Sequence, residues 1–338
     1  MKKFSILIPA YNAEKFILDN LNSLKQQRYR DWEAIVVNDG STDNTLDVVS
    51  SFVRKNPSLD IKIISIPNGG LANARNIALE NCTGEYFCNL DADDFFEPEA
   101  LAIVAEVNKA EHCDIYYYDI IDYDEITNKK EIFSDKFWKP TNTLSGIDAA
   151  IYKLQRRIWI CQGVAFYRKK FIDDIGLLNI KGINQGEDMF FITASLSQAK
   201  SVKYIPYPGT SIRYRSDSMM HSIFNESHLQ SVRAIDALQN YIDSKNIDIS
   251  KKNKLSTLIQ RERILQELRI DKSICDSCRS LADIKSTLGT LNKYSWKNSN
   301  PNRTIISLLS LSHRVQFYIR NNSPLAFIIL TKLYRLIK

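Results

Sequence analysis

The chain up to about residue 120 alternates short apolar runs with amphipathic stretches. The runs have the length and the β-branched and aromatic content of buried strands, and the stretches repeat apolar residues at the helical period. The predicted strands are residues 4–9, 32–37, 61–66, 86–90 and 114–118, and the predicted helices are residues 13–27, 43–55, 71–81 and 98–110. This alternation predicts an α/β fold with a doubly wound, mostly parallel, Rossmann-like sheet. In such sheets ligands bind beyond the carboxyl ends of the strands.

The pattern changes twice along the rest of the chain. Residues 120–145 are polar and irregular, which predicts a hairpin or a loop insertion, and a mixed region continues to about residue 222. The periodicity of the last part predicts helices at about 226–244, 251–271, 279–291, 303–320 and 324–337. We therefore expect one domain over residues 1–222, with halves at about 1–120 and 121–222, and a separate helical C-terminal region over residues 223–338.

The composition is that of a soluble protein with a sizeable core. Of the 338 residues, 44% are hydrophobic and 25% are charged, which excludes the disordered and fibrous classes. The residues Met1–Lys3 lead straight into the first predicted strand, so no secretory signal is expected and the protein should be cytoplasmic. The cysteines are too dispersed for a disulfide scaffold, and the lone pair Cys275 and Cys278 favours neither a zinc site nor redox chemistry.

The net charge of +6 resides at the C-terminal end of the chain. No acidic residue follows Asp283, whereas nine Lys and Arg residues do, and the chain before them carries 36 basic and 39 acidic residues. This segment predicts an anionic partner surface, and nucleic acid is not expected because no recognition motif is present. The apolar run within residues 323–338 is shorter than the ~20 residues of a membrane span. It predicts either a helix in the membrane interface or a terminal helix that packs in the core.

Asp91, Asp93 and Asp94 place three carboxylates in four residues, directly after the predicted strand 86–90. Carboxylates this close repel one another, so a cation is expected among them. Mg²⁺ or Mn²⁺ fits, because such ions are held by one or two carboxylates and take their other ligands from substrate phosphates and water. The substrate is therefore expected to carry a diphosphate. The alternative is an acidic loop in which Asp94 or Glu97 caps the next helix.

Candidate binding residues follow the other predicted strands. Pro9 should end the first strand, and the ring of Tyr11 beyond it can stack on a planar base. Asp39 follows the second strand and can accept a hydrogen bond from a uracil N3–H or a ribose hydroxyl. Arg75 lies one turn into the helix after the third strand. It can face phosphates, pair with the carboxylates at 91–94, or simply lie on the surface.

Two adjacent acids, Glu187 and Asp188, follow Gly186 at the start of a predicted helix. Carboxylates are favoured at helix N-termini on electrostatic grounds alone, so capping is one interpretation. The other is catalytic, because transfer to a hydroxyl needs one general base, and Asp188 suits that role with Glu187 orienting it or binding the acceptor.

Basic residues and a histidine follow at 213–221. Arg213 and Arg215 are candidates for neutralising a leaving diphosphate, and His221 is a candidate metal ligand. A structural or exposed histidine is the alternative for His221. These positions lie far along the chain from the carboxylates at 91–94, so only the fold can bring them together.

Five ordered motifs resemble those of the family 2 glycosyltransferases, bacterial inverting enzymes with a GT-A fold. They are Ile8–Asn12, Asn38–Asp43, Ala74–Asn76, Asp91–Asp94 and Gly186–Asp188. The resemblance implies nucleotide-sugar binding at Tyr11 and Asp39 and metal-diphosphate binding at Asp93 with Asp91 or Asp94. With the candidates above, we expect a nucleotide-sugar site at Pro9, Tyr11, Asp39, Arg75, Asp91, Ala92, Asp93 and Arg215, and Mn²⁺ or Mg²⁺ at Asp91, Asp93, Asp94 and His221. The resemblance also implies Asp188 as the catalytic base. Asn38 departs from the family, which often has an aspartate there, and should alter nucleotide affinity without abolishing activity.

The chain is similar to family members that build O-antigen or lipopolysaccharide-core oligosaccharides, some of which add β1,3-linked glucose from UDP-glucose to a GlcNAc-diphosphate-lipid. The resemblance therefore implies a UDP-sugar donor bound by residues 1–120 and a lipid-linked saccharide acceptor bound by residues 121–222, at the inner-membrane surface. Transferases for capsule, core or teichoic acid that use UDP-Gal or UDP-GlcNAc are the alternative. A phosphatase of the DxD type and a non-catalytic sugar-binding protein are the rivals outside this class.

Overall fold

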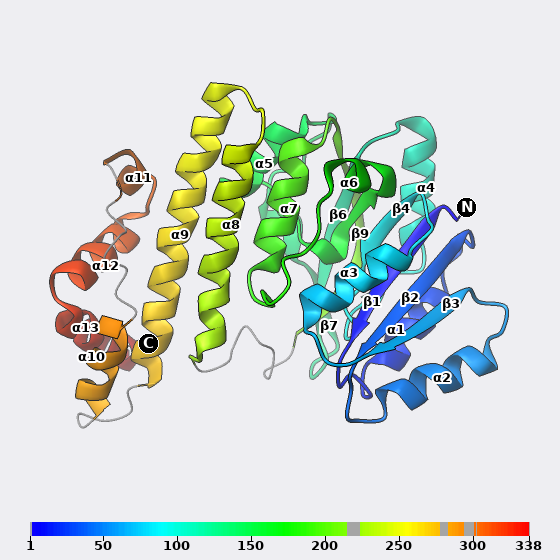
Figure 1. Cartoon of the computed structure of the whole chain (residues 1–338), viewed down its shortest axis with the longest axis horizontal. Coiled ribbons are helices and arrows are strands. Elements are labelled where there is room, and N and C mark those ends of the chain that lie inside the picture. The colour runs from blue at the N-terminus through cyan, green and yellow to red at the C-terminus, as the bar shows by residue number, and fades with distance from the viewer. Residues whose placement is uncertain (1, 215–223, 278–282, 294–300, 302, 338) are drawn as a thin grey trace. The chain divides into compact units, whose positions relative to one another are not determined.

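A computed structural model describes residues 2–214, 224–277, 283–293, 301 and 303–337. The chain divides into two compact units, Met1–Ser216 and Asp217–Lys338 (Figure 1). The predicted His221 and Arg215 lie outside the described residues.

The first unit is built on one sheet with helices on its faces (Figure 1). The strands are β1 Phe4–Ala10, β2 Trp32–Asp39, β3 Ile61–Ile66, β4 Tyr86–Asn89, β5 Phe95–Phe96, β6 Ile115–Asp124, β7 Lys129–Ile132, β8 Ala165–Arg168 and β9 Val202–Tyr214. The helices are α1 Ile17–Lys25, α2 Thr45–Lys55, α3 Leu71–Asn81, α4 Ala100–Ala110, α5 Gly146–Leu154, α6 Lys169–Ile175 and α7 Glu187–Gln198. All the strands and helices predicted up to residue 120 are present, and so is the hairpin predicted beyond it, as β6 and β7.

The strand order is β3-β2-β1-β4-β8-β6-β9-β5, with β7 paired to β6. The strands β1 to β4 are parallel, as are β6 and β9, whereas β8 runs antiparallel between β4 and β6. The predicted doubly wound, mostly parallel sheet is therefore confirmed. The connection from β1 leads to β2, and the connection from β3 leads to β4 on the other side of β1. The strand order therefore switches at β1, and a crevice for ligands is expected at the carboxyl end of that strand.

Pro9 does not end β1, contrary to the prediction. It pairs with Val37 inside the strand, which continues to Ala10. The Leu7 carbonyl accepts a hydrogen bond from the Leu90 N–H, so Leu7 faces β4. Pro9 lies two residues further along the strand, so the position of its missing N–H also faces β4. The pairing of β1 with β4 has already ended at Leu7, so no ladder hydrogen bond is lost.

The strand β9 was not predicted, and it contains Pro206 and Pro208, which are uncommon inside strands. The structure accommodates them at an irregularity. Along β6, Tyr118 pairs with Ile205 and the next residue pairs with Pro208, so the register shifts where the prolines lie. Such a bulge removes the need for their ladder hydrogen bonds and lets the rest of the strand pair normally.

Apolar side chains on one face of the sheet pack against α1, α2 and α4. Ile6 and Ile8 of β1 share this core with Ile17 of α1, Phe52 of α2 and Leu101 of α4. The helix α3 packs against β1 and β2 on the other face, in front of the sheet in Figure 1. Burial on both faces explains why these strands are continuous apolar runs, and it fixes the strand ends that carry the polar loops.

The second unit is helical in its described parts. Its helices are α8 Gln230–Ser244, α9 Ile249–Ser277, α10 Ile284–Lys293, α11 Arg303–Ser307, α12 Leu311–Asn322 and α13 Pro324–Ile337. The predicted helix 303–320 is divided in two, because Ser310 caps α12 by accepting a hydrogen bond from the His313 N–H. Among the described residues, no helix combines the length and the apolar character needed to cross a bilayer.

Candidate functional site at the carboxyl ends of the strands

The loops after β1 and β2 hold each other. The side-chain oxygen of Asn12 accepts a hydrogen bond from the Thr42 N–H at 2.8 Å, and the Asn12 N–H donates to Ser41 Oγ at 3.1 Å. The Asn38 side chain accepts from the Ser41 N–H at 3.3 Å, so this departure from the family motif serves the same turn. Tyr11 is left 53% exposed at the rim, where its ring is accessible to a ligand.

Asp39 is buried and anchors the loop after β3. One carboxylate oxygen accepts from the Gly69 N–H at 2.7 Å and the other from the Gly70 N–H at 2.9 Å. Each oxygen retains a further lone pair. The carboxylate therefore fixes the backbone that leads into α3, a role that the sequence did not indicate.

Gly70 brings the start of α3 against the loop that precedes α7. Its backbone lies at φ 84° and ψ 163°, which is open essentially only to glycine. A Cβ atom there would lie 2.4 Å from the Asn184 side-chain nitrogen. The Asn184 oxygen accepts from the Ala72 N–H at 3.2 Å. This contact brings the segment before Glu187 to the strand ends.

Arg75 is the centre of the site. Its side chain is only 3% exposed, so the surface interpretation is wrong. Nη2 lies 2.8 Å from Asp91 Oδ1, while Nη1 lies 3.0 Å from Glu187 Oε1 and 3.4 Å from Asp188 Oδ1. Burial alone would lower the pKa of the guanidinium, but the three carboxylates raise it, so the guanidinium stays charged. One cation thus joins the loop after β4 to the acids at the start of α7.

The two acids of α7 differ in exposure. The side chain of Glu187 is 10% exposed and that of Asp188 is 41% exposed. Burial and the neighbouring Asp188 raise the pKa of Glu187 to about 7, although Arg75 opposes the shift. Burial and the charge of Asp91 raise the pKa of Asp188, against the effects of Arg75 and Lys153. The contribution of Lys153 was not foreseen, because nothing in its local sequence links it to Asp188.

Capping accounts for neither acidic cluster. No side chain caps α7, which begins directly after Gly186 at φ 82°. The helix α4 likewise begins without a side-chain cap, and Glu97 instead accepts from Lys130 and Ser211. The carboxylates after β4 and at the start of α7 are held by other contacts.

Asp94 is buried within the loop after β4. Its carboxylate accepts from the Arg213 N–H at 3.0 Å, and the Asn20 side chain donates to the carbonyls of Asp91 and Asp94, both at 3.0 Å. Burial, together with the charges of Asp93 and Asp91, raises the pKa of Asp94 well above its usual range. These contacts give the Asp94 carboxyl a structural part in shaping the loop.

Arg213 does not serve the diphosphate as the sequence suggested. The side chain is buried, with Nη1 2.7 Å from Glu125 and Nη2 2.8 Å from Asp19. Its Nε donates to the Asp93 carbonyl at 3.2 Å. The whole guanidinium is engaged in bracing this loop against α1 and the end of β6.

The described members of the predicted metal set, Asp91, Asp93 and Asp94, do not form a metal-binding cluster by themselves. Over the parts of the chain that the structure describes, no group of three or more His, Cys, Asp or Glu side chains could hold one ion. Asp91 pairs with Arg75 and Asp94 faces Arg213, whereas Asp93 is half-buried beside them. This donor set fits a cation that takes most of its ligands from substrate phosphates and water, as Mg²⁺ and Mn²⁺ do. Two further predicted contacts, Pro9 and Ala92, are buried at the same strand ends.

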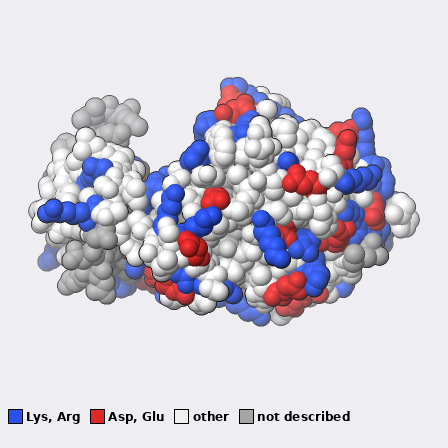
Figure 2. All heavy atoms as spheres, turned by 90° about the horizontal axis from the view of Figure 1, so that it is seen from above, with Lys and Arg blue, Asp and Glu red and all other residues white. Residues whose placement is uncertain are grey.

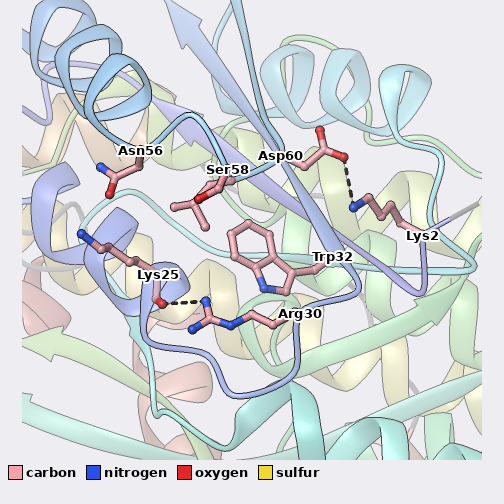
Figure 3. A pocket seen from close by; sticks show the side chains of 8 residues that line it. Lys2, Lys25, Arg30, Trp32, Asn56, Ser58 and Asp60 are labelled. Carbon is pink, nitrogen blue, oxygen red and sulfur yellow. Dashed lines mark hydrogen bonds and ion pairs between the residues drawn. The ribbon is translucent and has the colours of Figure 1, made fainter.

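A separate cavity of about 450 Å³ lies at the opposite, amino ends of the strands (Figure 3). It is lined by Lys2 before β1, Trp32 at the start of β2 and Asp60 before β3, together with Lys25 and Arg30. Lys2 pairs with Asp60 at 3.3 Å. None of the residues predicted from the motifs borders it, so the candidate site is the cluster around Arg75.

Comparison with known proteins identifies the family of this chain. The family model described as Glycosyl transferase family 2 matches residues 5–176. Chondroitin synthase of Pasteurella multocida is 43% identical over 99 residues, which make up 29% of this chain and 10% of that protein. The poly(ribitol-phosphate) beta-N-acetylglucosaminyltransferase TarS of Staphylococcus aureus is 37% identical over 117 residues, or 34% of this chain and 20% of that protein. The matched segments thus span a fifth or less of these relatives.

Solved structures extend the likeness over the whole chain. The crystal structure of S. aureus TarS 1-349 in complex with UDP-GlcNAc matches with a TM-score of 0.71 and 21% identity, covering 99% of this chain and 92% of that one. A mannosyltransferase from Pyrobaculum calidifontis, in complex with GDP-Man and Mn²⁺, matches with a TM-score of 0.52 and 15% identity, covering 99% and 87%. These matches confirm the GT-A fold with a helical C-terminal region.

Proposed function

The chain belongs to glycosyl transferase family 2, and we propose that it is a metal-dependent inverting hexosyltransferase. It moves a hexose, with glucose in β linkage as the first choice, from a UDP-sugar to a lipid-linked saccharide acceptor in O-antigen or lipopolysaccharide biosynthesis. A lipid-linked acceptor implies work at the cytoplasmic face of the inner membrane. The family match ends before α7, so the role of Glu187 and Asp188 rests on the contacts of Arg75.

The contact of one buried guanidinium with Asp91, Glu187 and Asp188 carries this proposal. Inverting transfer needs a leaving diphosphate and a general base near the same anomeric carbon. The loop of Asp91 and Asp93 follows β4, where a diphosphate is expected, and Asp188 begins a helix far along the chain. Arg75 links the two, which is the arrangement that such a reaction requires.

Asp188 is the proposed base. Its carboxylate is accessible enough to meet an acceptor hydroxyl, and a raised pKa strengthens it as a base near neutral pH. The carboxylate takes the hydroxyl proton while the hydroxyl oxygen forms a bond to the anomeric carbon. The bond from that carbon to the UDP oxygen breaks on the opposite face, and the configuration inverts. Glu187, buried and paired with Arg75, is a positioning residue for Asp188.

The donor is proposed to lie across the strand ends. Tyr11 stacks on the uracil, and Asp39 accepts from the base or the ribose through its remaining lone pairs. Pro9 and Ala92, both buried at the same strand ends, complete this side of the site. Asp93, with Asp91, would hold Mn²⁺ or Mg²⁺, and a bound cation would offset the negative charge on the leaving diphosphate.

A donor screen tests this function. Purified protein is incubated with UDP-Glc, UDP-Gal and UDP-GlcNAc and a GlcNAc-diphosphate-lipid, with Mn²⁺ or with EDTA. We expect UDP release and a lipid-linked disaccharide whose new linkage is β, as measured by the anomeric coupling in NMR. A product of α configuration, or release of inorganic phosphate from simple phosphomonoesters instead of UDP, would contradict the proposal.

A second candidate is an N-acetylglucosaminyltransferase for another cell-surface glycan, such as teichoic acid. The likeness to TarS, crystallised with UDP-GlcNAc, favours it. Preference for UDP-GlcNAc over UDP-Glc in the same screen would select this candidate. It would leave the roles of Asp188 and Asp93 unchanged.

A further inference from the structure

The helix α12 exposes a stripe of apolar side chains. Leu311, Val315 and Tyr318 are 75%, 48% and 54% exposed, and their spacing of four and three residues places them on one face of the helix. Phe317, on another face, belongs to the core of the second unit. Arg320 is buried with its Nε 2.7 Å from Asp271. The helix is thus anchored by one side and leaves an apolar side uncovered.

The neighbouring α13 repeats this division. Phe327 and Ile328 are 3% and 1% exposed and pack in the same core, which agrees with the core-packing interpretation of the terminal helix. Leu325 and Ile329, one turn apart, remain 43% and 45% exposed. Leu308, just before α12, is 42% exposed. We call these exposed side chains the C-terminal apolar surface: Leu308, Leu311, Val315, Tyr318, Leu325 and Ile329.

The chain segment that carries this surface has charges of one sign. Residues 217–283 carry ten acidic and ten basic residues, whereas residues 284–338 carry nine Lys and Arg and no acidic residue. Two of these nine cations, Lys293 and Arg320, pair with carboxylates at 226 and 271. The left end of Figure 2, toward which α11 and α12 lie in Figure 1, shows basic and uncharged side chains.

We propose that the C-terminal apolar surface docks on a bilayer that contains anionic lipids. Apolar side chains on a segment with an excess of basic residues match an acyl boundary beneath negative head groups. Tyr318 suits the interface because its ring is apolar and its hydroxyl is polar. A second copy of the chain is a poorer occupant, since its approach would bring two basic segments together. This inference rests on the proposed function, because docking on a membrane would bring the enzyme to a lipid-linked acceptor.

Vesicle binding tests this surface with the full chain. The protein is sedimented with phosphatidylcholine vesicles that contain or lack phosphatidylglycerol, at low and at high salt. We expect binding only with phosphatidylglycerol and a decrease with salt. The double variant Leu311→Ser/Tyr318→Ser should lower the partition coefficient by about tenfold or more. Ile126→Ser, a 91% exposed apolar residue between β6 and β7, should leave it unchanged.

Three results would overturn the docking. They are equal partition of the double variant and the parent, equal binding to both vesicle types, and a parent dimer in light scattering that the double variant converts to monomer. UDP release with a soluble saccharide acceptor separates this inference from the proposed function. Loss of vesicle binding with UDP release retained supports docking, and a chain that binds vesicles through this surface but transfers no sugar leaves docking intact and rejects the proposed function.

Discussion

The Arg75 guanidinium lies 3.0 Å from the Glu187 carboxylate, although 112 residues separate them along the chain. The two side chains are only 3% and 10% exposed, so the pair is shielded from solvent. The other guanidinium nitrogen binds Asp91 at 2.8 Å. This single side chain makes the distance between the loop after β4 and the start of α7 a fixed property of the fold, and it is where changes should have the largest effects.

Replacing Arg75 should destabilise the protein. In Arg75→Met the buried Glu187 loses its cation and faces Asp188 unopposed, which should lower the free energy of unfolding by about 3–5 kcal/mol. Urea denaturation followed by circular dichroism measures this. The control is Arg28→Met, whose 75% exposed side chain pairs with Glu99 and should cost no more than about 1 kcal/mol. Similar losses for both variants would show that the Arg75 network adds nothing to stability.

Removing the base should abolish transfer without loss of donor binding. Asp188→Asn keeps the size of the side chain but cannot accept the hydroxyl proton, so kcat should fall by about 10²–10⁴. Calorimetric titration with UDP should give an unchanged Kd. Asp174→Asn, an exposed acid on α6 that pairs with Lys170, should retain full activity. Substantial transfer by Asp188→Asn would assign the base elsewhere.

The activity should rise with pH through about 7. Burial and Asp188 raise the pKa of Glu187 to about 7, so only above that pH is Glu187 the charged partner that pairs with Arg75 and positions Asp188. Glu187→Gln removes a like charge beside Asp188. The pKa of Asp188 should therefore fall, and the acid limb of the kcat/KM profile should move to lower pH. A limb that stays in place, or moves to higher pH, would contradict this coupling.

Alanine should be tolerated less well at Gly70 than at a glycine with open space around it. Gly70→Ala strains a backbone conformation reserved for glycine, which costs about 1–3 kcal/mol, and displaces Asn184 from the Ala72 N–H, which costs about 1 kcal/mol more. Gly176→Ala is the control. Its residue is also left-handed, at φ 62° and ψ 34°, but a Cβ there meets nothing within 4 Å, so about 1–2 kcal/mol is expected. Thermal unfolding of both variants measures the difference in stability. Equal losses of stability would show that the contact with Asn184 contributes nothing.

Asp93 and Asp94 should behave differently toward metal. Asp93→Asn should raise the Mn²⁺ concentration needed for half-maximal activity by more than about tenfold. Asp94→Asn should not, because the buried Asp94 carboxyl has a raised pKa and faces the Arg213 N–H. Activity titrated with Mn²⁺ after EDTA treatment distinguishes them. A larger shift for Asp94→Asn would make Asp94 the main ligand and Asp93 the supporting residue.

Local sequence patterns were sufficient for the first half of the sheet. β1, β2 and β4 are buried on both faces and are largely apolar runs followed by polar loops, whereas β3 is a half-buried edge strand. The ends of all four strands could be located to within two residues. Since parallel strands present their carboxyl ends at one edge, the strand pattern alone groups Tyr11, Asp39 and Asp91 at that edge. The strand β9 was not predicted. Its prolines are accommodated by a shift in the pairing register with β6, and this pairing cannot be read from the local sequence of β9.

The sequence by itself determined which residue types reach the edge of the sheet, because strand length, periodicity and turn chemistry act over a few residues. The tertiary structure alone decided how their charges are shared. Arg75 could have faced phosphates, carboxylates or solvent, and burial beside Asp91, Glu187 and Asp188 selected the carboxylates. Likewise Arg213, a candidate for the diphosphate, was drawn to Asp19 and Glu125. These partners lie between 16 and 194 residues away along the chain, a separation that leaves no mark in the local pattern.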